Sequence, residues 1–329
     1  MEKNPLYLGI DVGSVSTNFV ATNGRDEIVY KLYLRTGGQP IKAIRKGMKT
    51  LSRAVGEDVL IGGIGTTGSG RQLAGTIMGA DTIKNEITTH AIAAQKLIPG
   101  VRTVMEIGGQ DSKIIIIKNG VVYDFAMNTV CAAGTGSFLD RQAARLEIPI
   151  NEFGSFALRA KSPVRIAGRC AVFAESDMVH KQQTGHSVED IIGGLCEALV
   201  RNYLNNLGKG KKIEDPIVFQ GGVAANIGIV QAFKKNIGKN IVIPKYYDVM
   251  GAYGAALIAR EEVEAKGGAT SFCGFEKSQG DYKARSIECS GCSNMCEVIE
   301  IMFDGKVLAR WGDRFGKWSA LEGESQSVS

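Results

Sequence analysis

The sequence predicts an α/β protein with two related domains and a small cysteine-rich segment at its C-terminal end. Three observations lead there. Strand-like and helix-like apolar segments alternate along the 329 residues. Residues 8–24 and 104–120 repeat one pattern, and four of the seven cysteines lie between residues 273 and 296. With 44% hydrophobic and 22% charged residues, the chain has the composition of a protein with a substantial core.

The first element is predicted over residues 8–24, LGIDVGSVSTNFVATNG, and its counterpart over residues 104–120, VMEIGGQDSKIIIIKNG. Each segment has an apolar strand with an acid, Asp11 or Glu106, then a glycine-containing polar turn, a second apolar strand and Asn-Gly. Asn-Gly between extended segments is typical of a hairpin, so we expect each half to open with one hairpin. The turns would offer backbone N–H groups to an anion, and the acids suit Mg²⁺.

A third glycine turn follows at residues 217–233, IVFQGGVAANIGIVQAF, where a strand leads through Gly221 and Gly222 into a helix. Such a turn can hold a nucleotide's phosphate or sugar at the helix N-terminus. The chain has no G-x-x-x-x-G-K-[ST] motif, and the glycines of residues 63–75 lack the dinucleotide spacing. Three glycine turns of this kind favour a nucleotide cleft over three structural turns.

Two helices are predicted to begin just after a cysteine, Cys131 in FAMNTVCAAGTGSFLDRQAARL and Cys170 in AGRCAVFAESDMVHKQQ. The N-terminus of a helix favours a thiolate. Cys196 lies on the apolar side of a helix over residues 190–207 and is interpreted as a buried thiol. The histidines lie in polar helical or loop stretches and are interpreted as surface or second-shell residues rather than catalytic bases; they are His90, His180 and His186.

The motifs GIDVGSVSTN, EIGGQDSK, FQGGVAAN and DVMGAYGAAL resemble the phosphate, adenosine and closing motifs of the actin/Hsp70/sugar-kinase ATPase superfamily, whose domains are ribonuclease H-like. With the two cysteine segments, they resemble the BadF/BadG/BcrA/BcrD-type ATPases over roughly residues 5–265. That branch includes activators of 2-hydroxyacyl-CoA dehydratases and reductases of double-cubane cluster proteins. We therefore expect domains at residues 1–97 and 98–265, with a metal-binding extension at 266–329.

The resemblance implies an ATP-dependent, low-potential electron donor that is a homodimer. One 4Fe–4S cluster would lie at the two-fold axis, held by Cys131 and Cys170 of each chain. A dimer can supply the four thiolates that two cysteines per chain cannot. Glu106 stands where the superfamily usually has Asp, which leaves the Mg²⁺ coordination open. The implied residues are Asp11, Glu106 and Asp111 for Mg²⁺ and water, Gln110 near the γ-phosphate, Gly13, Ser14, Val15, Ser16, Gly108 and Gly109 at the phosphates, Gly221, Gly222 and Asn226 at the adenosine, and Gly251 closing the pocket.

The partners implied by the resemblance are a cluster-containing reductase or dehydratase and an upstream ferredoxin- or flavodoxin-like donor. The net charge is +5, and no basic stripe interleaved with aromatic residues is visible, so nucleic-acid binding is disfavoured. No apolar segment approaches the ~20 residues of a membrane span, and the first residues lack a signal-like apolar region. We expect a cytoplasmic protein without a membrane partner.

The cysteine-rich segment follows a linker predicted at residues 264–272. Its Asp-Gly turn within VIEIMFDGKVLARW predicts a hairpin. A segment this small cannot bury enough core by itself, so a bound metal ion is the simplest explanation of its fold, and its cysteines are candidate ligands. Zinc, a second iron–sulfur cluster and unliganded thiols all remain open. The four candidate ligands are Cys273, Cys289, Cys292 and Cys296.

Two other functions compete with the electron donor. A small-molecule kinase of the same superfamily would use the same phosphate turns, with Asp111 as the base on a sugar hydroxyl, but it would leave Cys131 and Cys170 without a role. A nucleotide-gated regulatory or chaperone-like module is disfavoured because no separate peptide-binding domain is evident. A brown colour after anaerobic preparation would support the cluster, and sugar-stimulated ATPase activity of a colourless protein would support the kinase.

Overall fold

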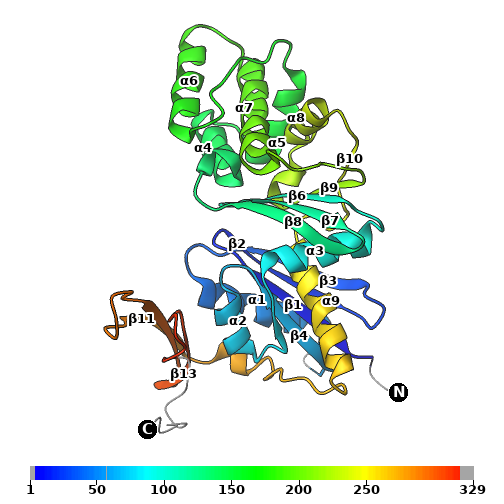
Figure 1. Cartoon of the computed structure of the whole chain (residues 1–329), viewed down its shortest axis with the longest axis vertical. Helices are drawn as coiled ribbons and strands as arrows, with labels where there is room; N and C mark the ends of the chain where they lie inside the picture. The colour runs from blue at the N-terminus through cyan, green and yellow to red at the C-terminus, as the bar shows by residue number, and fades with distance from the viewer. Residues whose placement is uncertain (1–3, 57, 319–329) are drawn as a thin grey trace.

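The computed structural model describes residues 4–56 and 58–318 as two lobes of α/β structure and a small third sheet (Figure 1). The ends of the predicted first and third domains, residues 1–3 and 319–329, lie outside the described residues. In lobe I a five-stranded sheet has the order β3-β2-β1-β4-β5. Its strands are β1 (Leu6–Val12), β2 (Ser16–Thr22), β3 (Ile28–Arg35), β4 (Ile61–Thr67) and β5 (Thr82–Ile83), and its helices are α1 (Pro40–Val55), α2 (Arg71–Met78) and α3 (Glu86–Leu97).

Lobe II repeats this arrangement with the sheet order β10-β9-β6-β7-β8. In both lobes three antiparallel strands are followed by two parallel ones. The strands are β6 (Thr103–Ile107), β7 (Ser112–Lys118), β8 (Val121–Asn128), β9 (Ile217–Gln220) and β10 (Ile241–Val242). The helices are α4 (Gly136–Arg145), α5 (Ile150–Arg159), α6 (Ala171–Gln183), α7 (Val188–Tyr203) and α8 (Ile227–Ile237), with short helical turns at Ala132–Gly134, Leu204–Gly208 and Gly222–Ala225. The predicted duplicated α/β fold is confirmed.

Each repeated segment forms the one hairpin that the sequence predicts, and a third strand, β3 or β8, follows it. The glycine-containing polar turn joins the first two strands, as expected, at residues 13–15 and 108–111. The Asn-Gly pairs, however, connect the second strand to a third, β2 to β3 and β7 to β8. The hairpin signal was therefore valid but belonged to the next turn along the chain.

The last helix before the C-terminal sheet, α9 (Met250–Ala265), packs on lobe I (Figure 1). Two strand glycines allow this contact: a Cβ on Gly9 would lie 1.8 Å from the Ala252 carbonyl oxygen, and one on Gly65 would lie 2.3 Å from that of Ala255. The hydroxyl of Tyr253 also donates to the Asp26 carbonyl at 3.0 Å. Lobe I thus contains residues 250–265, which the predicted boundaries place in the second domain.

The core of lobe II lies between its sheet and helices α5, α7 and α8. Phe233 contacts the rings of Tyr203 and Phe219 edge-on, with centroids 5.2 and 5.0 Å away. Cys196 is buried on α7, in agreement with its interpretation as a structural thiol. Burial raises the pKa of this thiol to about 12, so it stays protonated at neutral pH.

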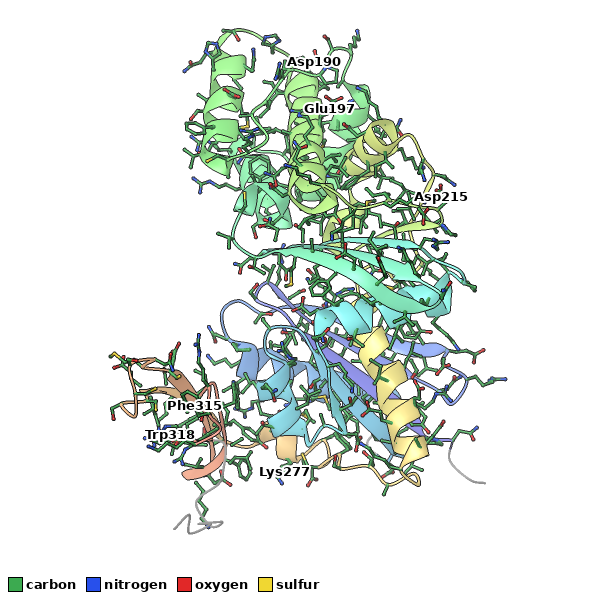
Figure 2. The ribbon with its side chains drawn as sticks, in the orientation of Figure 1. Asp190, Glu197, Asp215, Lys277, Phe315 and Trp318 are labelled. Atoms are coloured by element: carbon green, nitrogen blue, oxygen red, sulfur yellow. The ribbon has the colours of Figure 1, made fainter. Side chains whose placement is uncertain are left out.

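The C-terminal segment forms a three-stranded antiparallel sheet of β11 (Tyr282–Glu288), β12 (Glu297–Phe303) and β13 (Lys306–Trp311), after a short turn at Lys277–Gln279. The predicted hairpin corresponds to β12 and β13, and β11 is an additional strand. Tyr282 and Ile301 pack into the core of lobe I. Figure 2 shows Lys277 beneath lobe I, and Phe315 and Trp318 on the small sheet. Within the described residues, no helix has the length and apolarity to cross a membrane.

Candidate functional site

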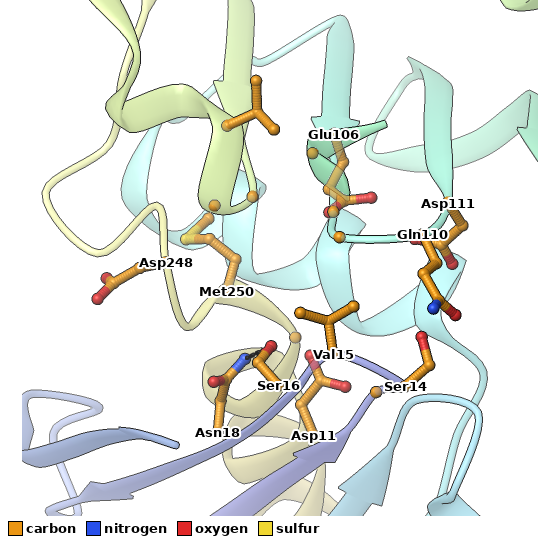
Figure 3. A pocket seen from close by; sticks show the side chains of 18 of the residues that line it. Asp11, Ser14, Val15, Ser16, Asn18, Glu106, Gln110, Asp111, Asp248 and Met250 are labelled. Carbon is orange, nitrogen blue, oxygen red and sulfur yellow. Dashed lines mark hydrogen bonds between the residues drawn. The ribbon is translucent and has the colours of Figure 1, made fainter. Parts of the chain in front are cut away.

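A cavity of about 680 Å³ lies between the two lobes. Figure 3 shows Asp11 and Ser14–Ser16 of lobe I opposite Glu106, Gln110 and Asp111 of lobe II. Every residue that the sequence analysis assigned to the nucleotide lines this cavity. They are Asp11, Gly13, Ser14, Val15, Ser16, Glu106, Gly108, Gly109, Gln110, Asp111, Gly221, Gly222, Asn226 and Gly251.

The two phosphate turns are built alike and contact each other. In the first turn the Gly13 N–H donates to the Ser16 carbonyl at 2.8 Å, and in the second turn the Gly108 N–H donates to the Asp111 carbonyl at 3.0 Å. Val15 packs directly on Gly109, where a Cβ would lie 2.5 Å from a Val15 methyl carbon. The absence of a side chain at Gly109 thus lets the two turns meet across the cleft.

The third glycine turn forms the wall of the cavity beneath β9. Gly221 has φ +87°, a conformation that favours glycine, and its N–H donates to the Tyr247 carbonyl at 2.8 Å. Asn226 caps α8 by accepting from the Ile229 N–H, while its Nδ2 has no hydrogen-bond partner among the described residues. Within the same part of the chain, the buried Oδ1 of Asn18 is also unpartnered. Unpartnered buried polar atoms are costly, so these two fit a ligand with donors and acceptors of its own.

A buried lysine at the floor of the cavity was missed by the sequence analysis. Lys113 Nζ lies 2.6 Å from Glu86, 3.0 Å from Glu106 and 2.9 Å from Asp111. Only 2% of its side chain is exposed. Burial alone would lower the pKa of Lys113, but the carboxylates of Glu106, Glu86 and Asp111 outweigh it and raise this pKa. The ammonium group therefore stays charged and ties α3 to both ends of the second phosphate turn.

The acids of the cavity floor are strongly perturbed. Burial, and then the charge of Glu86, raise the pKa of Asp11 to about 7. Burial raises the pKa of Glu106 to about 8 against the opposing charge of Lys113. Carboxylates held in this way are typical of functional sites, and their oxygens are the ligands that Mg²⁺ prefers. Gly251 allows Asp11 to lie here, since a Cβ would be 2.3 Å from Asp11 Oδ2.

His90 is buried at the edge of this cavity. It is therefore not a surface residue, which was one of the two predicted possibilities, and it lies behind the acids of the cavity floor, which was the other. Its Nδ1 lies 2.8 Å from Gln220 Nε2, which donates to it. Burial and the charge of Lys113 lower the pKa of His90 to about 3, so the ring is neutral at physiological pH. The neutral ring of His90 thus holds the Gln220 amide in place. The other two histidines, His180 and His186, are placed on or just after α6, away from the cavity.

The segments that carry Cys131 and Cys170 come together at the surface of lobe II, although 38 positions of the chain separate Cys131 from Arg169, the residue before Cys170. Cys131 Sγ lies 3.7 Å from the Arg169 carbonyl oxygen, directly beside Cys170, and both thiols are partly exposed. Cys131 precedes the helical turn at Ala132–Gly134 and Cys170 precedes α6, as predicted. The amide of Asn202 on α7 donates to the Gly168 carbonyl at 2.5 Å and lies 3.9 Å from Cys131 Sγ, which joins the two segments.

Comparison with known proteins agrees with this geometry. Residues 8–259 match the model of the BadF/BadG/BcrA/BcrD ATPase family. The chain belongs to this family. It is 33% identical to the 2-hydroxyisocaproyl-CoA dehydratase activator of Clostridioides difficile over 263 residues, 78% of this chain and 96% of that protein. It is 34% identical to the (R)-2-hydroxyglutaryl-CoA dehydratase activating ATPase of Acidaminococcus fermentans over 252 residues, 77% of this chain and 96% of that protein.

A solved structure also aligns with this family member over both lobes. The activator of the 2-hydroxyisocaproyl-CoA dehydratase from Clostridium difficile, with bound ADPNP, superposes with a TM-score of 0.72 at 32% identity. The match covers 79% of this chain and 96% of that one. The ATPase fold of the family is therefore confirmed, while the C-terminal sheet lies beyond the family match.

The C-terminal cysteines are not gathered into one four-thiolate set. Cys289 and Cys296 face each other at the base of the β11–β12 loop, where the Cys289 N–H donates to the Cys296 carbonyl at 2.8 Å, and Cys292 is exposed within that loop. Cys273 instead lies against α2, with Sγ 3.3 Å from the Ile77 carbonyl oxygen. Across residues 4–56 and 58–318, no three His, Cys, Asp or Glu side chains are arranged to hold a metal ion.

Proposed function

We propose that this protein is an ATP-dependent, low-potential electron donor that transfers electrons to a cluster-containing reductase or dehydratase. Its membership of an ATPase family supports the nucleotide half of this function. Relatives named as activators of 2-hydroxyacyl-CoA dehydratases support the class of partner. The observation that carries the electron-transfer half is the contact of Cys131 with the residue before Cys170, which places two partly exposed cysteines near each other on the lobe that forms the second phosphate turn.

In the nucleotide cleft, the chain's own residues would bind the phosphates and position the attacking water. Both glycine turns line the cavity, and backbone N–H groups of such turns can bind phosphate oxygens. Asp11, Glu106 and Asp111 would hold Mg²⁺, which retains several waters and so needs few protein ligands. Gln110 lines the same cavity and would orient the water for attack on the γ-phosphate. Asn18 and Asn226 offer their unpartnered atoms to the ligand.

At the cysteine surface, Cys131 and Cys170 would be two of the four thiolate ligands of a 4Fe–4S cluster. Such a cluster supplies one-electron transfer at low potential when bound. Because one chain provides only two ligands here, a symmetric homodimer would complete the set. Val130, Val172 and Phe173 beside the cysteines are 94%, 68% and 66% exposed, and such an apolar patch supports a protein interface.

The reaction sequence also needs a source of electrons and an acceptor. A ferredoxin- or flavodoxin-like protein would reduce the shared cluster, and ATP hydrolysis would alter the dimer face from which the electron leaves. Double-cubane cluster proteins and 2-hydroxyacyl-CoA dehydratases are the two acceptor classes that we propose. The extra C-terminal sheet, absent from the matched length of the relatives, favours a reductase role over that of a minimal activator.

Anaerobic purification with iron analysis and spectroscopy tests the cluster. We expect a brown protein with about two iron atoms per chain attributable to the shared site, since a 4Fe–4S cluster is divided between two chains. Cys131→Ala should remove that iron while leaving the fold intact. Cys196→Ala, which removes a thiol buried on α7, is the matched control and should keep it. Retention of the iron by Cys131→Ala, or a colourless protein with sugar-stimulated ATPase activity, would contradict the proposal.

We also propose that Cys289, Cys292 and Cys296 bind zinc or iron in the β11–β12 loop, where binding would have to draw together thiols that are not arranged around one point in the described residues. Their C-x₂-C-x₃-C spacing places three thiols in one loop, and the N–H of Gly291 donates to the Cys289 sulfur and lowers the pKa of that thiol. Cys273, held against α2, would not belong to this site without a rearrangement. Cys292→Ala should lower the zinc or iron content of the anaerobic protein. An unchanged metal content would identify these residues as free thiols.

A further inference from the structure

The segment from Asn128 to Ser137, here named the strap, joins the nucleotide cavity to Cys131. Its first part continues β8 and its last residues begin α4. Both ends form part of the cavity wall, because Thr129 and Gly136 line it. Cys131 lies between these two ends. The strap is therefore the shortest connection between the phosphates and a proposed cluster ligand.

The C-terminal end of the strap is hydrogen bonded to the second phosphate turn. The Gly136 N–H donates to the Gly108 carbonyl and the Ser137 N–H donates to the Gly109 carbonyl, both at 2.8 Å. The Ser137 hydroxyl donates to the Gly109 carbonyl as well, at 2.5 Å. Gly136 is required here, since a Cβ would lie 2.9 Å from the Gly108 oxygen. Three hydrogen bonds thus fasten the first turn of α4 to the turn that faces the phosphates.

These contacts involve the same peptide units that would bind phosphate. The Gly109 carbonyl and the Gln110 N–H belong to one planar peptide group, as do the Gly108 carbonyl and the Gly109 N–H. A phosphate that draws either N–H toward itself must rotate the attached carbonyl. Since that carbonyl is the acceptor for Gly136 or Ser137, the rotation moves or strains the beginning of α4.

The N-terminal end of the strap holds Cys131 from the other side of the same turn. Asn128 is the ladder partner of Ser112, the residue directly after the phosphate turn. Its side chain accepts from the Cys131 N–H at 2.9 Å and donates to the Cys131 carbonyl at 2.8 Å. The backbone of Cys131 is therefore positioned by residues that flank the second phosphate turn at both ends.

A contact from lobe I reaches α4 as well. Arg35 at the end of β3 lies 3.7 Å from Asp140 on α4, and both residues line the cavity. Both side chains are substantially exposed, so this pair contributes little energy by itself. Ser137 is the better candidate, because its hydroxyl lies 2.5 Å from the Gly109 carbonyl oxygen and so joins the strap directly to the second phosphate turn.

We infer that the strap transmits nucleotide binding to Cys131, and that Ser137 is the positioning residue on which this coupling depends. The inference rests on the proposed function, in which ATP binds at the second phosphate turn and Cys131 is a cluster ligand. Only with both of these does a coupling between the two sites have a purpose. Two discrete arrangements of the strap, with and without a phosphate on the turn, would make Cys131 respond to ATP.

Hydrogen–deuterium exchange of the full-length dimeric protein tests this, with Mg-ATP and Mg-ADP as ligands. In the wild type, nucleotide should slow exchange in residues 106–111 and change it in residues 128–135 by about fivefold or more, the lower range of site-to-site coupling. In Ser137→Ala, residues 106–111 should still respond and the nucleotide Kd should stay within about twofold. The response of residues 128–135 should fall below about twofold.

Two further variants make the result specific. Ser137→Thr keeps the hydroxyl and should restore the response of residues 128–135. Ser176→Ala removes a hydroxyl that bonds only to the Val172 carbonyl on α6 and should behave as wild type. An undiminished response of residues 128–135 in Ser137→Ala, or none in the wild type while residues 106–111 respond, would overturn the inference. Failure of residues 106–111 to respond in the wild type would instead contradict the proposed ATP site.

Discussion

At the scale of single residues, the cleft depends on one cation among several acids. Asp11, Glu86, Glu106 and Asp111 approach the floor of the cavity, and Lys113 contacts three of them. A buried charge is tolerated only when it is paired, so this lysine and its partners stabilise one another. The four acids thus offer carboxylate oxygens of the kind that a divalent cation prefers.

Replacing Lys113 by Ala should destabilise the protein, because three acids would lose the cation between them. Removing one partner of a buried ion pair typically costs 3–5 kcal/mol, and we expect a loss of about that size in the free energy of unfolding. Millimolar Mg²⁺ should recover part of it by replacing the lost charge. Urea denaturation with and without Mg²⁺ measures both effects. Lys118→Ala, on the same strand but stacked on the Tyr123 ring, is the control. A Lys113→Ala stability within about 1 kcal/mol of wild type would show that the pairing contributes little.

At the scale of elements, the C-terminal sheet shows how a strand without a large core is stabilised. Glu300 on β12 is fully buried, and its carboxylate accepts from Arg285 at 2.5 Å on β11 and from Arg310 at 2.7 Å on β13. Burial alone would raise the pKa of Glu300, but these two guanidinium groups outweigh it and hold the pKa below its usual range. One carboxylate thereby joins all three strands.

Glu300→Ala should therefore weaken this sheet. We expect a loss of about 1–3 kcal/mol, less than for a fully buried pair because Arg285 is 57% exposed. Both tryptophans of the chain, Trp311 and Trp318, lie in this region, so their fluorescence during denaturation monitors it selectively. Glu288→Ala, exposed on β11, should have little effect. Equal fluorescence midpoints for the two variants would rule out the proposed role of Glu300.

The ion pairs of Glu300 with Arg285 and Arg310 also make the sheet sensitive to acid. Glu300 has a lower pKa in the folded protein than in the unfolded chain, where it is near the ordinary 4.5. Its contribution to stability is thus complete above about pH 4.5 and is lost as the pH falls toward the folded-state pKa. As the pH is lowered through this range, the urea midpoint detected by tryptophan fluorescence should decrease for wild type. For Glu300→Ala this midpoint should decrease less. Parallel pH profiles of the two proteins would contradict this linkage.

At the scale of the whole molecule, the two lobes share one strand order (Figure 1) and enclose the cleft. Cys131 and Cys170 both belong to lobe II. A symmetric dimer formed through that surface would leave both clefts and both C-terminal sheets outside the interface. Domain movements around each nucleotide could then change the angle between the two copies. We propose that the exposed apolar side chains beside the cysteines form the interface of this dimer.

Phe173→Asp should weaken the dimer by at least about tenfold in Kd, because it places a charge in the centre of the proposed interface. Sedimentation of the anaerobic protein measures this, and its iron content should decrease in parallel. The control is Leu158→Asp on α5, where an apolar side chain that is 52% exposed lies away from the cysteines. If Phe173→Asp sediments as wild type does, the dimer uses another face.

The sequence by itself determined the duplicated α/β fold, the three glycine turns and the cysteines at two helix N-termini, because turn chemistry and hydrophobic periodicity act over a few neighbouring residues. Only the tertiary structure decided which distant residues meet. It placed α9 on lobe I through Gly9 and Gly65, separated Cys273 from the cysteines of the β11–β12 loop, and brought Glu86 to Lys113. A lysine in the apolar strand KIIIIK was a signal for a buried charge, but Glu86 carried none. Burial and charge pairing arise from contacts between segments far apart in the chain, and no local pattern encodes them.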